Sequence, residues 1–266
     1  MISLNNDFLG YHPKEHKVNF SGSDTAERFI ANLKLQPEDW YYRNNPISYS
    51  RNKNGHRCKD IEDIDLDNYI LFSGCSHTEG IGLRLEDSYA YLLSNNLNMD
   101  YYNLAVGGTG TDAVNYNIAT WFAKVKKPPK LVIVQWPHHV RATTRFFENP
   151  HNYIPEPWYN YGIWSSRDTN NKNHKEIGNF LVSGEDIGYF KSLRILAKTL
   201  VHNIAQCPII EITTDYDELN AGEYQLRQVD QARDISPSMP RGHMGIKSEE
   251  INSQLLYQKA KKLLNI

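Results

Sequence analysis

The segment "SGCSHTEGIG", residues 73–82, places Ser76 among glycines and polar side chains directly after an apolar run. Three kinds of chemistry suit such a turn. Glycines and free amides at a helix start can bind phosphate, although the chain has neither GxGxxG nor GxxxxGK[ST]. Ser76 or Thr78 could instead cap the following helix. The third interpretation is a serine nucleophile whose oxyanion is stabilised by backbone amides.

Residues later in the chain favour the nucleophile. A nucleophilic serine needs a general base, and the base needs an orienting group. After the apolar run "CPIIEIT", the sequence holds one histidine, His243, with Asp230 and Asp234 shortly before it. The segment "NLAVGGTG" adds Gly108, whose backbone amide could point into the same crevice. This set predicts acyl transfer through a serine and a histidine.

The elements that would position these residues alternate along the chain. Apolar runs predict strands at "YILFSG", "YYNLAVGG", "LVIVQW" and "CPIIEIT". Helical patterns follow at "YAYLLSNNL", "AVNYNIATWFAKV", "GEDIGYFKSLRILAKTLVHNIAQ" and "KSEEINSQLLYQKAKKLL". The alternation predicts an α/β fold with a mostly parallel sheet flanked by helices. Ligands bind such sheets at the carboxyl ends of the strands.

Two regions interrupt this pattern. Residues 1–66 are polar and loop-rich, and we expect an N-terminal extension packed on a core domain of residues 67–266. Residues 142–183 are rich in Tyr, Trp, Asn and Pro and lack a clear period, which predicts a long functional loop inserted in that domain.

Composition excludes several functional classes. The chain has 29 basic and 31 acidic residues and no long basic run, so nothing in its charge favours a nucleic-acid partner. We expect a soluble protein without an export signal or membrane span, because no stretch approaches ~18 apolar residues. The three cysteines lack CxxC spacing, and "SHTE" and "PHH" lack established metal-ligand spacing, so no metal or organic cofactor is expected.

The order of the motifs resembles that of the SGNH, or GDSL-type, hydrolase family. "FSGCSHTEG" is similar to the family's first block, GDSxTxG, and "NLAVGGTG" is similar to the second. "GHMGIKSEE" is similar to the last block, HPGxxSH. The segment "NKNGHR", residues 52–57, resembles an NxxGxR segment of some bacterial and bacteriophage-encoded members. The resemblance covers about residues 52–262 and implies a flavodoxin-like three-layer sandwich that hydrolyses esters in the cytoplasm or on a virion.

The resemblance also implies roles for individual residues. Ser76 falls on the nucleophile, Gly108 on the oxyanion-hole glycine and His243 on the catalytic base. Cys75 replaces the usual aspartate of the first block, and its thiol is an alternative nucleophile. The acid three residues before the histidine is missing, because Pro240 stands there.

Two further departures leave alternatives open. Asp234 could serve as the third member if "ISPSMP" loops out, or a backbone carbonyl could orient a Ser-His dyad. The family's GxND block is replaced by "VQWPHHVR", so the oxyanion-hole asparagine is missing. His138 or His139 could donate in its place, or both could simply line a polar loop.

Aromatic residues suggest the substrate. Flat rings stack on sugars and amides bind hydroxyls, which favours an O-acetylated carbohydrate over a long-chain lipid. The candidate rings and contacts are Trp40, Tyr41, Tyr42, Trp136, Arg141, Trp158, Tyr159, Tyr161 and Trp164, of which Trp136, Arg141 and Trp158 are the predicted substrate-binding residues. Two alternatives to a hydrolase remain: a binding or virion-surface module without turnover, and an O-acyltransferase that uses the same residues. The oligomeric state is not indicated.

Overall fold

A parallel sheet forms the centre of the protein. The computed structural model describes residues 2–11, 17–138, 141–145, 158–162, 172–183, 187–213, 224–235 and 242–266. The sheet has the order β11-β10-β7-β5-β6, and each of its pairings is parallel. Its strands are β5 (Tyr69–Ser73), β6 (Asp100–Asn103), β7 (Leu131–Trp136), β10 (Ile209–Thr213) and β11 (Tyr224–Gln225). This is the flavodoxin-like order, and the predicted α/β fold is confirmed.

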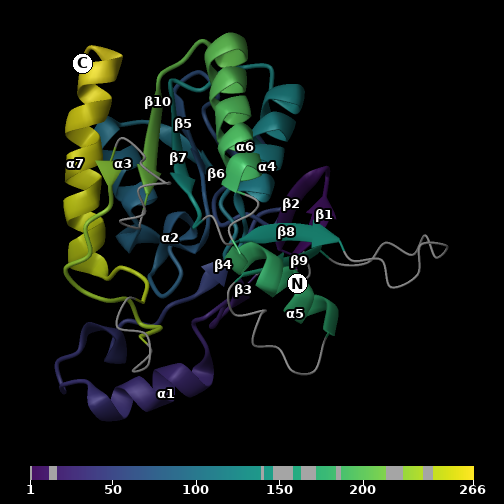
Figure 1. Ribbon diagram of the computed structural model, residues 1–266. Helices are drawn as coiled ribbons and strands as arrows, with labels where there is room; N and C mark the ends of the chain where they lie inside the picture. Colours follow the sequence, from purple (N-terminus) through teal and green to yellow (C-terminus); the bar gives the residue numbers. More distant parts are fainter. Residues whose placement is uncertain are drawn as a thin grey trace.

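Helices cover both faces of this sheet, as Figure 1 shows. On one face α3 (Tyr89–Leu97) and α7 (Ile246–Leu264) pack on Ile70 and Phe72. On the other face α4 (Thr111–Lys124) and α6 (Ile187–Leu200) pack on Tyr69 and Leu71. Successive strand residues point to opposite faces, so a strand covered on both sides must be apolar throughout. The first four residues of β5 are accordingly hydrophobic, and all five, including the terminal serine, are buried.

The buried carboxyl group of Glu249 links the two helices of the first face. The Tyr89 amide at the start of α3 donates to Glu249 Oε2 at 2.5 Å. Burial raises the pKa of Glu249 to about 8, from an ordinary value of 4.5. Between about pH 4.5 and pH 8 the folded protein therefore holds a proton on Glu249 that the unfolded chain has released.

This proton makes stability depend on pH. The contribution of Glu249 is fully present below its unfolded pKa and is lost as pH rises toward 8. Glu249→Gln keeps a hydrogen-bond acceptor that cannot ionise, so we expect it to raise the melting temperature at pH 8 and change it little at pH 5. Thermal melts at both pH values, with exposed Glu250→Gln as the control, check this. An equal shift at the two pH values would contradict it.

A second, antiparallel sheet joins the N-terminus to the region after β7. Its order is β2-β1-β9-β8, formed by β1 (Ile2–Asn5), β2 (Phe8–Tyr11), β8 (Ala142–Arg145) and β9 (Trp158–Tyr161). Residues 142–183 also contain α5 (Lys172–Ser183). The prediction of a loop without regular structure is therefore wrong for these ranges. Strands of four residues that pair with a distant partner leave no detectable period in the sequence.

The remaining N-terminal elements form a lobe below the sheet, with α1 at its outer side (Figure 1). They are β3 (Lys17–Val18), α1 (Ala26–Leu35), the 3-10 turn Tyr41–Arg43 and β4 (Tyr49–Ser50). The 3-10 turn Ile61–Asp63 instead packs on the core of the central sheet through Ile61. Tyr42, Ile47 and Tyr49 of this lobe pack against Ile81 and Ala232 of the core domain. The lobe therefore shares a hydrophobic interior with the segments on which the candidate site lies.

Candidate active site

Ser76 lies where the direction of strand addition reverses. It begins the short helix α2 (Ser76–Glu79), directly beyond the carboxyl end of β5, and its side chain is buried. The chain passes from β5 to β6 on one side and later returns to β7 on the other. Loops diverge at such a switch point and leave a crevice, which is the usual ligand position in open α/β sheets.

Ser76, His243 and Asp234 form one hydrogen-bonded chain. Ser76 Oγ lies 2.6 Å from His243 Nε2, and His243 Nδ1 lies 2.6 Å from Asp234 Oδ2. An ionised carboxylate only accepts, so Nδ1 carries the proton and Nε2 is left to accept from the serine hydroxyl. The structure thus brings together the three residues that the sequence singled out from separate segments.

A close backbone approach returns Asp234 to the histidine. The Ala232 amide donates to the His243 carbonyl at 2.9 Å, and the Arg233 amide donates to the Gly82 carbonyl at 3.0 Å. Gly82 has φ +81, and an added Cβ would lie 2.9 Å from Asp234 Oδ1. Only glycine fits comfortably there. Residues 236–241, the segment "SPSMPR" after this contact, lie outside the described residues.

The surroundings keep Asp234 ionised. Burial by itself raises its pKa, but the His243 imidazole and hydrogen bonds from His243 and Ser23 lower the pKa below the ordinary Asp value. The ring of His77 lies 4.8 Å from that of His243. Burial, with the charges of His243 and Arg141, holds the pKa of His77 well below its usual range. A neutral His77 does not oppose a positive charge on His243.

Asp230 has a different task from Asp234. Its Oδ1 accepts from the Ser248 amide at 2.7 Å and from the Ser248 hydroxyl at 2.6 Å, and its Oδ2 accepts from the Lys247 amide at 3.0 Å. These are free donors of the first turn of α7. Asp230 therefore caps that helix, and the carboxylate beside His243 is Asp234.

The turn after β6 brings Gly107 and Gly108 beside Ser76. A Cβ added at Gly107 would lie 3.6 Å from Ser76 Cβ. The Gly107 amide donates to Glu79 Oε2 at 2.6 Å, and Tyr11 donates to the same oxygen at 3.1 Å. The Gly107 amide is therefore already hydrogen-bonded to Glu79. Gly108 stays the glycine of this turn that is predicted to donate to the oxyanion.

Asn160 of β9 supports this turn, and sequence reasoning missed it. Its amide nitrogen donates to the Gly107 carbonyl at 3.0 Å, and its oxygen accepts from Thr143 Oγ1 at 2.9 Å. No motif marks Asn160; only the many asparagines of the insertion hint at such a role. His138 is half-buried after β7, and His139 lies outside the described residues. Both stay predictions as oxyanion donors.

The Cys75 thiol is hydrogen-bonded to Gln135. It donates to Gln135 Oε1 at 3.1 Å, and the side chain is only 1% exposed. Ser76, not Cys75, reaches His243. Arg141 Nη1 lies 3.6 Å from Cys75 Sγ, so the predicted substrate-binding arginine stands at the site.

Trp136 does not fit its predicted role. It is 1% exposed and packs in the core, where its indole nitrogen donates to Glu211 Oε1 at 2.9 Å. A ring enclosed in this way has no face for a substrate, because β7 is covered by α6 on this side. The side chain of Trp158 lies outside the described part of the structure, so its role stays a prediction.

The rings of the predicted aromatic platform that the structure describes are buried or half-buried. Tyr42 contacts the rings of Trp40 and Tyr41 edge-on, at 5.1 and 5.3 Å between centroids, within the N-terminal lobe. Tyr161 is buried against Leu181 and other apolar residues. The buried rings of Tyr42 and Tyr161 stabilise the fold and offer no open face to a sugar, whereas Trp40 and Tyr41 are half-buried. Nothing is described for the side chain of Tyr159 or for Trp164.

The "NKNGHR" segment holds α2 in place. Arg57 is buried, and its Nη1 donates to the carbonyls of Gly80 and Glu79 at 2.6 and 3.2 Å. Its Nη2 donates to the carbonyls of Leu83 and Ser48 at 2.8 and 3.2 Å. One rigid guanidinium thus fixes the end of α2 and the loop that carries Gly82.

The other two residues of the NxxGxR pattern, Asn52 and Gly55, shape the turn that precedes Arg57. Asn52 Oδ1 accepts from the amides of Asn54 and His56, both at 3.0 Å. Gly55 has φ +77, and an added Cβ would lie 2.0 Å from the Tyr11 carbonyl oxygen. Asn52 and Gly55 therefore bend the chain so that Arg57 can reach α2.

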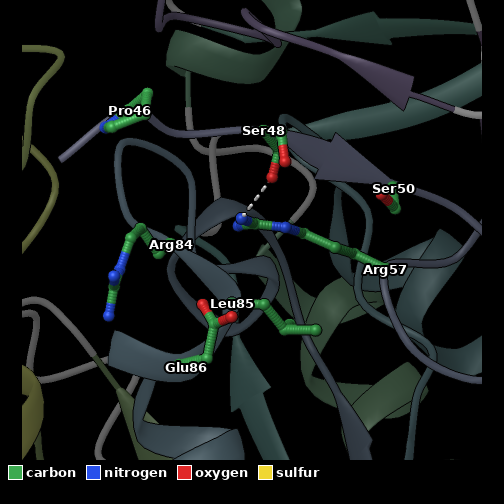
Figure 2. Close-up of a pocket in the computed structure, with 7 residues that line it drawn as sticks. All are labelled: Pro46, Ser48, Ser50, Arg57, Arg84, Leu85 and Glu86. Atoms are coloured by element: carbon green, nitrogen blue, oxygen red, sulfur yellow. Dashed lines mark hydrogen bonds between the residues drawn. The ribbon is translucent and has the colours of Figure 1, made fainter.

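A separate pocket lies on the outer side of Arg57. Figure 2 shows the Arg57 side chain bonded to Ser48 beside this cavity of about 330 Å³. Its lining residues are Pro46, Ser48, Ser50, Arg57, Arg84, Leu85 and Glu86, the last two from the 3-10 turn Leu85–Asp87. Neither Ser76 nor His243 lines it, so the pocket is distinct from the hydrogen-bonded chain.

No group of three or more His, Cys, Asp or Glu side chains among the described residues is arranged to hold a metal ion. Of the helices in the described ranges, none is both long and apolar enough to cross a membrane.

Several solved esterase structures have a backbone similar to that of this chain. A carbohydrate esterase family 2 enzyme with a carbohydrate-binding domain, from Corynascus thermopiles (Myceliophthora fergusii), is 11% identical over 81% of this chain and 71% of its own, with a TM-score of 0.46. An acetyl xylan esterase from the rumen bacterium Butyrivibrio proteoclasticus is 16% identical over 74% of this chain and 64% of its own, with a TM-score of 0.45.

A psychrotrophic esterase from Pseudoalteromonas sp. is 12% identical over 75% of this chain and 100% of its own, with a TM-score of 0.44. No protein-family model and no curated protein matches the chain. Likenesses at these identities and TM-scores carry neither an activity nor a substrate to this chain. The geometry of its own site must carry any functional conclusion.

Proposed function

We propose that the protein is a serine esterase that hydrolyses a short acyl ester. The observation that supports this most strongly is the chain of two 2.6 Å contacts from Ser76 through His243 to Asp234. It offers a hydroxyl, a base in the correct tautomer and an ionised group that orients the base. Those are the parts that acyl transfer through serine requires.

In the proposed reaction, Ser76 Oγ attacks the ester carbonyl while His243 Nε2 takes the hydroxyl proton. The backbone amides of Ser76 and Gly108 hold the resulting oxyanion, and each such donor can lower the barrier by ~3 kcal/mol. When the intermediate collapses, the bond to the alcohol breaks and His243 returns the proton to the leaving oxygen. Water, activated by the same base, then releases the acyl group as a carboxylic acid.

For the substrate we propose an acetyl ester of a carbohydrate. The support is polar: Asn160 and Arg141 stand beside the turn and the nucleophile, and both suit an alcohol rich in hydroxyl groups better than an aliphatic chain. Transfer of the acyl group to a sugar hydroxyl would use the same residues, with an alcohol in place of water.

A fluorophosphonate probe tests the proposal. We expect it to label the folded protein once, at Ser76, and to block hydrolysis of p-nitrophenyl acetate. Mass spectrometry of proteolytic peptides identifies the labelled residue. Labelling at Cys75 would move the role of nucleophile to the thiol. A folded protein that neither takes the label nor hydrolyses the ester would favour the binding module.

A further inference from the structure

Ser23, a residue of the N-terminal lobe, contacts both members of the Asp234–His243 pair. Its hydroxyl donates to Asp234 Oδ2 at 2.5 Å, and its Oγ lies 3.3 Å from His243 Nδ1. Asp234 is 3% exposed, and its Oδ1 has no hydrogen-bond partner among the described residues. Among the described residues, the Asp234 carboxylate therefore has two side-chain donors, His243 and Ser23.

The lobe holds Ser23 rigidly in that position. Residues 21–24 form a tight turn in which the amides and carbonyls of Ser21 and Asp24 bond each other at 3.0 Å. The Ser23 carbonyl accepts from Arg28 Nη1 at 3.0 Å. The turn is thus tied both across itself and to α1, so the Ser23 hydroxyl has a fixed place.

An ion pair next to Ser23 aligns the two segments. Asp24 is fully buried, and Arg233 donates to its two carboxylate oxygens at 3.0 and 2.6 Å. Asn32 of α1 adds bonds from its side-chain amide to the carbonyls of Arg233 and Ile235, at 3.1 and 2.9 Å. The dipeptide Ser23–Asp24 therefore faces Arg233–Asp234 through two contacts: a hydrogen bond from Ser23 to the ionised Asp234, and the ion pair of Asp24 with Arg233.

We propose that Ser23 is a positioning residue of the active site. Its hydroxyl fixes the Asp234 carboxylate so that Oδ2 stays aligned with His243 Nδ1, and the N-terminal lobe thereby completes the site. The inference rests on the proposed esterase function, because the alignment matters for a base that must accept the Ser76 proton. A hydrogen bond to an ionised group is worth more than one between neutral groups.

Kinetics of three variants on p-nitrophenyl acetate test the proposal. Ser23→Ala should lower kcat about tenfold at nearly constant KM, as expected when a charge-assisted hydrogen bond needed in the transition state is lost. Ser23→Thr, which keeps the hydroxyl, should restore most of the rate. Thr25→Ala is the matched control, because Thr25 Oγ1 in the same segment accepts from the Arg28 amide at 3.3 Å and caps α1 without contacting Asp234.

The pH profile separates positioning from folding. Loss of a donated hydrogen bond leaves the carboxylate more basic, so the acid limb of kcat/KM should move to higher pH in Ser23→Ala and stay in place in Thr25→Ala. The other charged or titratable groups around the pair are His77, Arg141, Asp24 and Arg233. All of them are unchanged in both variants.

Two outcomes would overturn the role of Ser23. One is a Ser23→Ala variant with wild-type kcat and acid limb; the other is an equal loss in Ser23→Ala and Thr25→Ala, which would indicate general loosening. If the wild type neither hydrolyses esters nor takes the fluorophosphonate, the proposed function fails instead. An NMR titration of the His243 imidazole in wild type and Ser23→Ala then still decides, because an unchanged titration midpoint overturns the contact.

Discussion

Ser76→Ala should lower kcat for p-nitrophenyl acetate by at least about 10³-fold, because no other hydroxyl is hydrogen-bonded to His243 Nε2 in the described residues. His243→Ala should cause a loss of similar size, since an unactivated serine is a poor nucleophile. The two residues act as one unit, so the double variant should be no slower than either single variant. Initial rates with purified, folded proteins measure all three.

Cys75→Ala is the control for the alternative nucleophile. The thiol bonds Gln135 and not the base, so we expect most of the activity to remain. Wild-type rates in Ser76→Ala, together with a collapse in Cys75→Ala, would reverse the assignment. Losses in the two single variants that multiply in the double variant would show that serine and histidine do not act together.

Much of the central fold can be read from the sequence. "LVIVQW" coincides with β7 (Leu131–Trp136), and "YAYLLSNNL" coincides with α3 (Tyr89–Leu97). Strands covered on both faces must be apolar at every position, which gives a signal that does not depend on tertiary partners. Helices that cover a sheet need one apolar face, which gives an equally local period.

The second sheet cannot be read in this way. Ile2 of β1 pairs with Trp158 of β9, so the strand exists only because a distant segment supplies its hydrogen bonds. The N-terminal lobe is similar, because its polar residues make specific long-range bonds. Asp24 and Arg233, for example, look like ordinary surface charges in sequence but form a buried ion pair.

The residues of the candidate site also differ in how far the sequence predicts them. Ser76 and His243 stand in short motifs at strand-to-helix junctions, so their order in the sequence predicts that they meet. Asp234 and Asp230 cannot be separated by sequence, because both precede His243 and only the backbone contact of Ala232 with His243 decides which carboxylate faces the ring. Ser23 carries no signal at all, since a serine in a polar turn is common.

Asp234→Asn should lower kcat by roughly 10²- to 10⁴-fold with little change in KM. Asparagine can donate to Nδ1 through its amide, which favours the tautomer with the proton on Nε2 and prevents His243 from accepting the Ser76 proton. The loss should be smaller than in His243→Ala, because the carboxylate orients the base and stabilises its charge but does not itself take the proton. Steady-state kinetics of both variants on one ester compare the two losses.

Asp230→Asn is the matched control, since it makes the same change in the other nearby aspartate. Asp230 accepts from the first turn of α7, and asparagine keeps one acceptor oxygen there but loses the negative charge, so the variant should be less stable by about 0.3–1 kcal/mol, the usual range for a charge at a helix N-terminus. Its kcat at a temperature where the variant is folded should stay near that of the wild type. A normal kcat in Asp234→Asn would remove Asp234 from the triad, and a fall confined to Asp230→Asn would move the orienting role there. The pair of variants therefore separates a carboxylate that orients the base from one that begins a helix, although the two lie four residues apart in the chain.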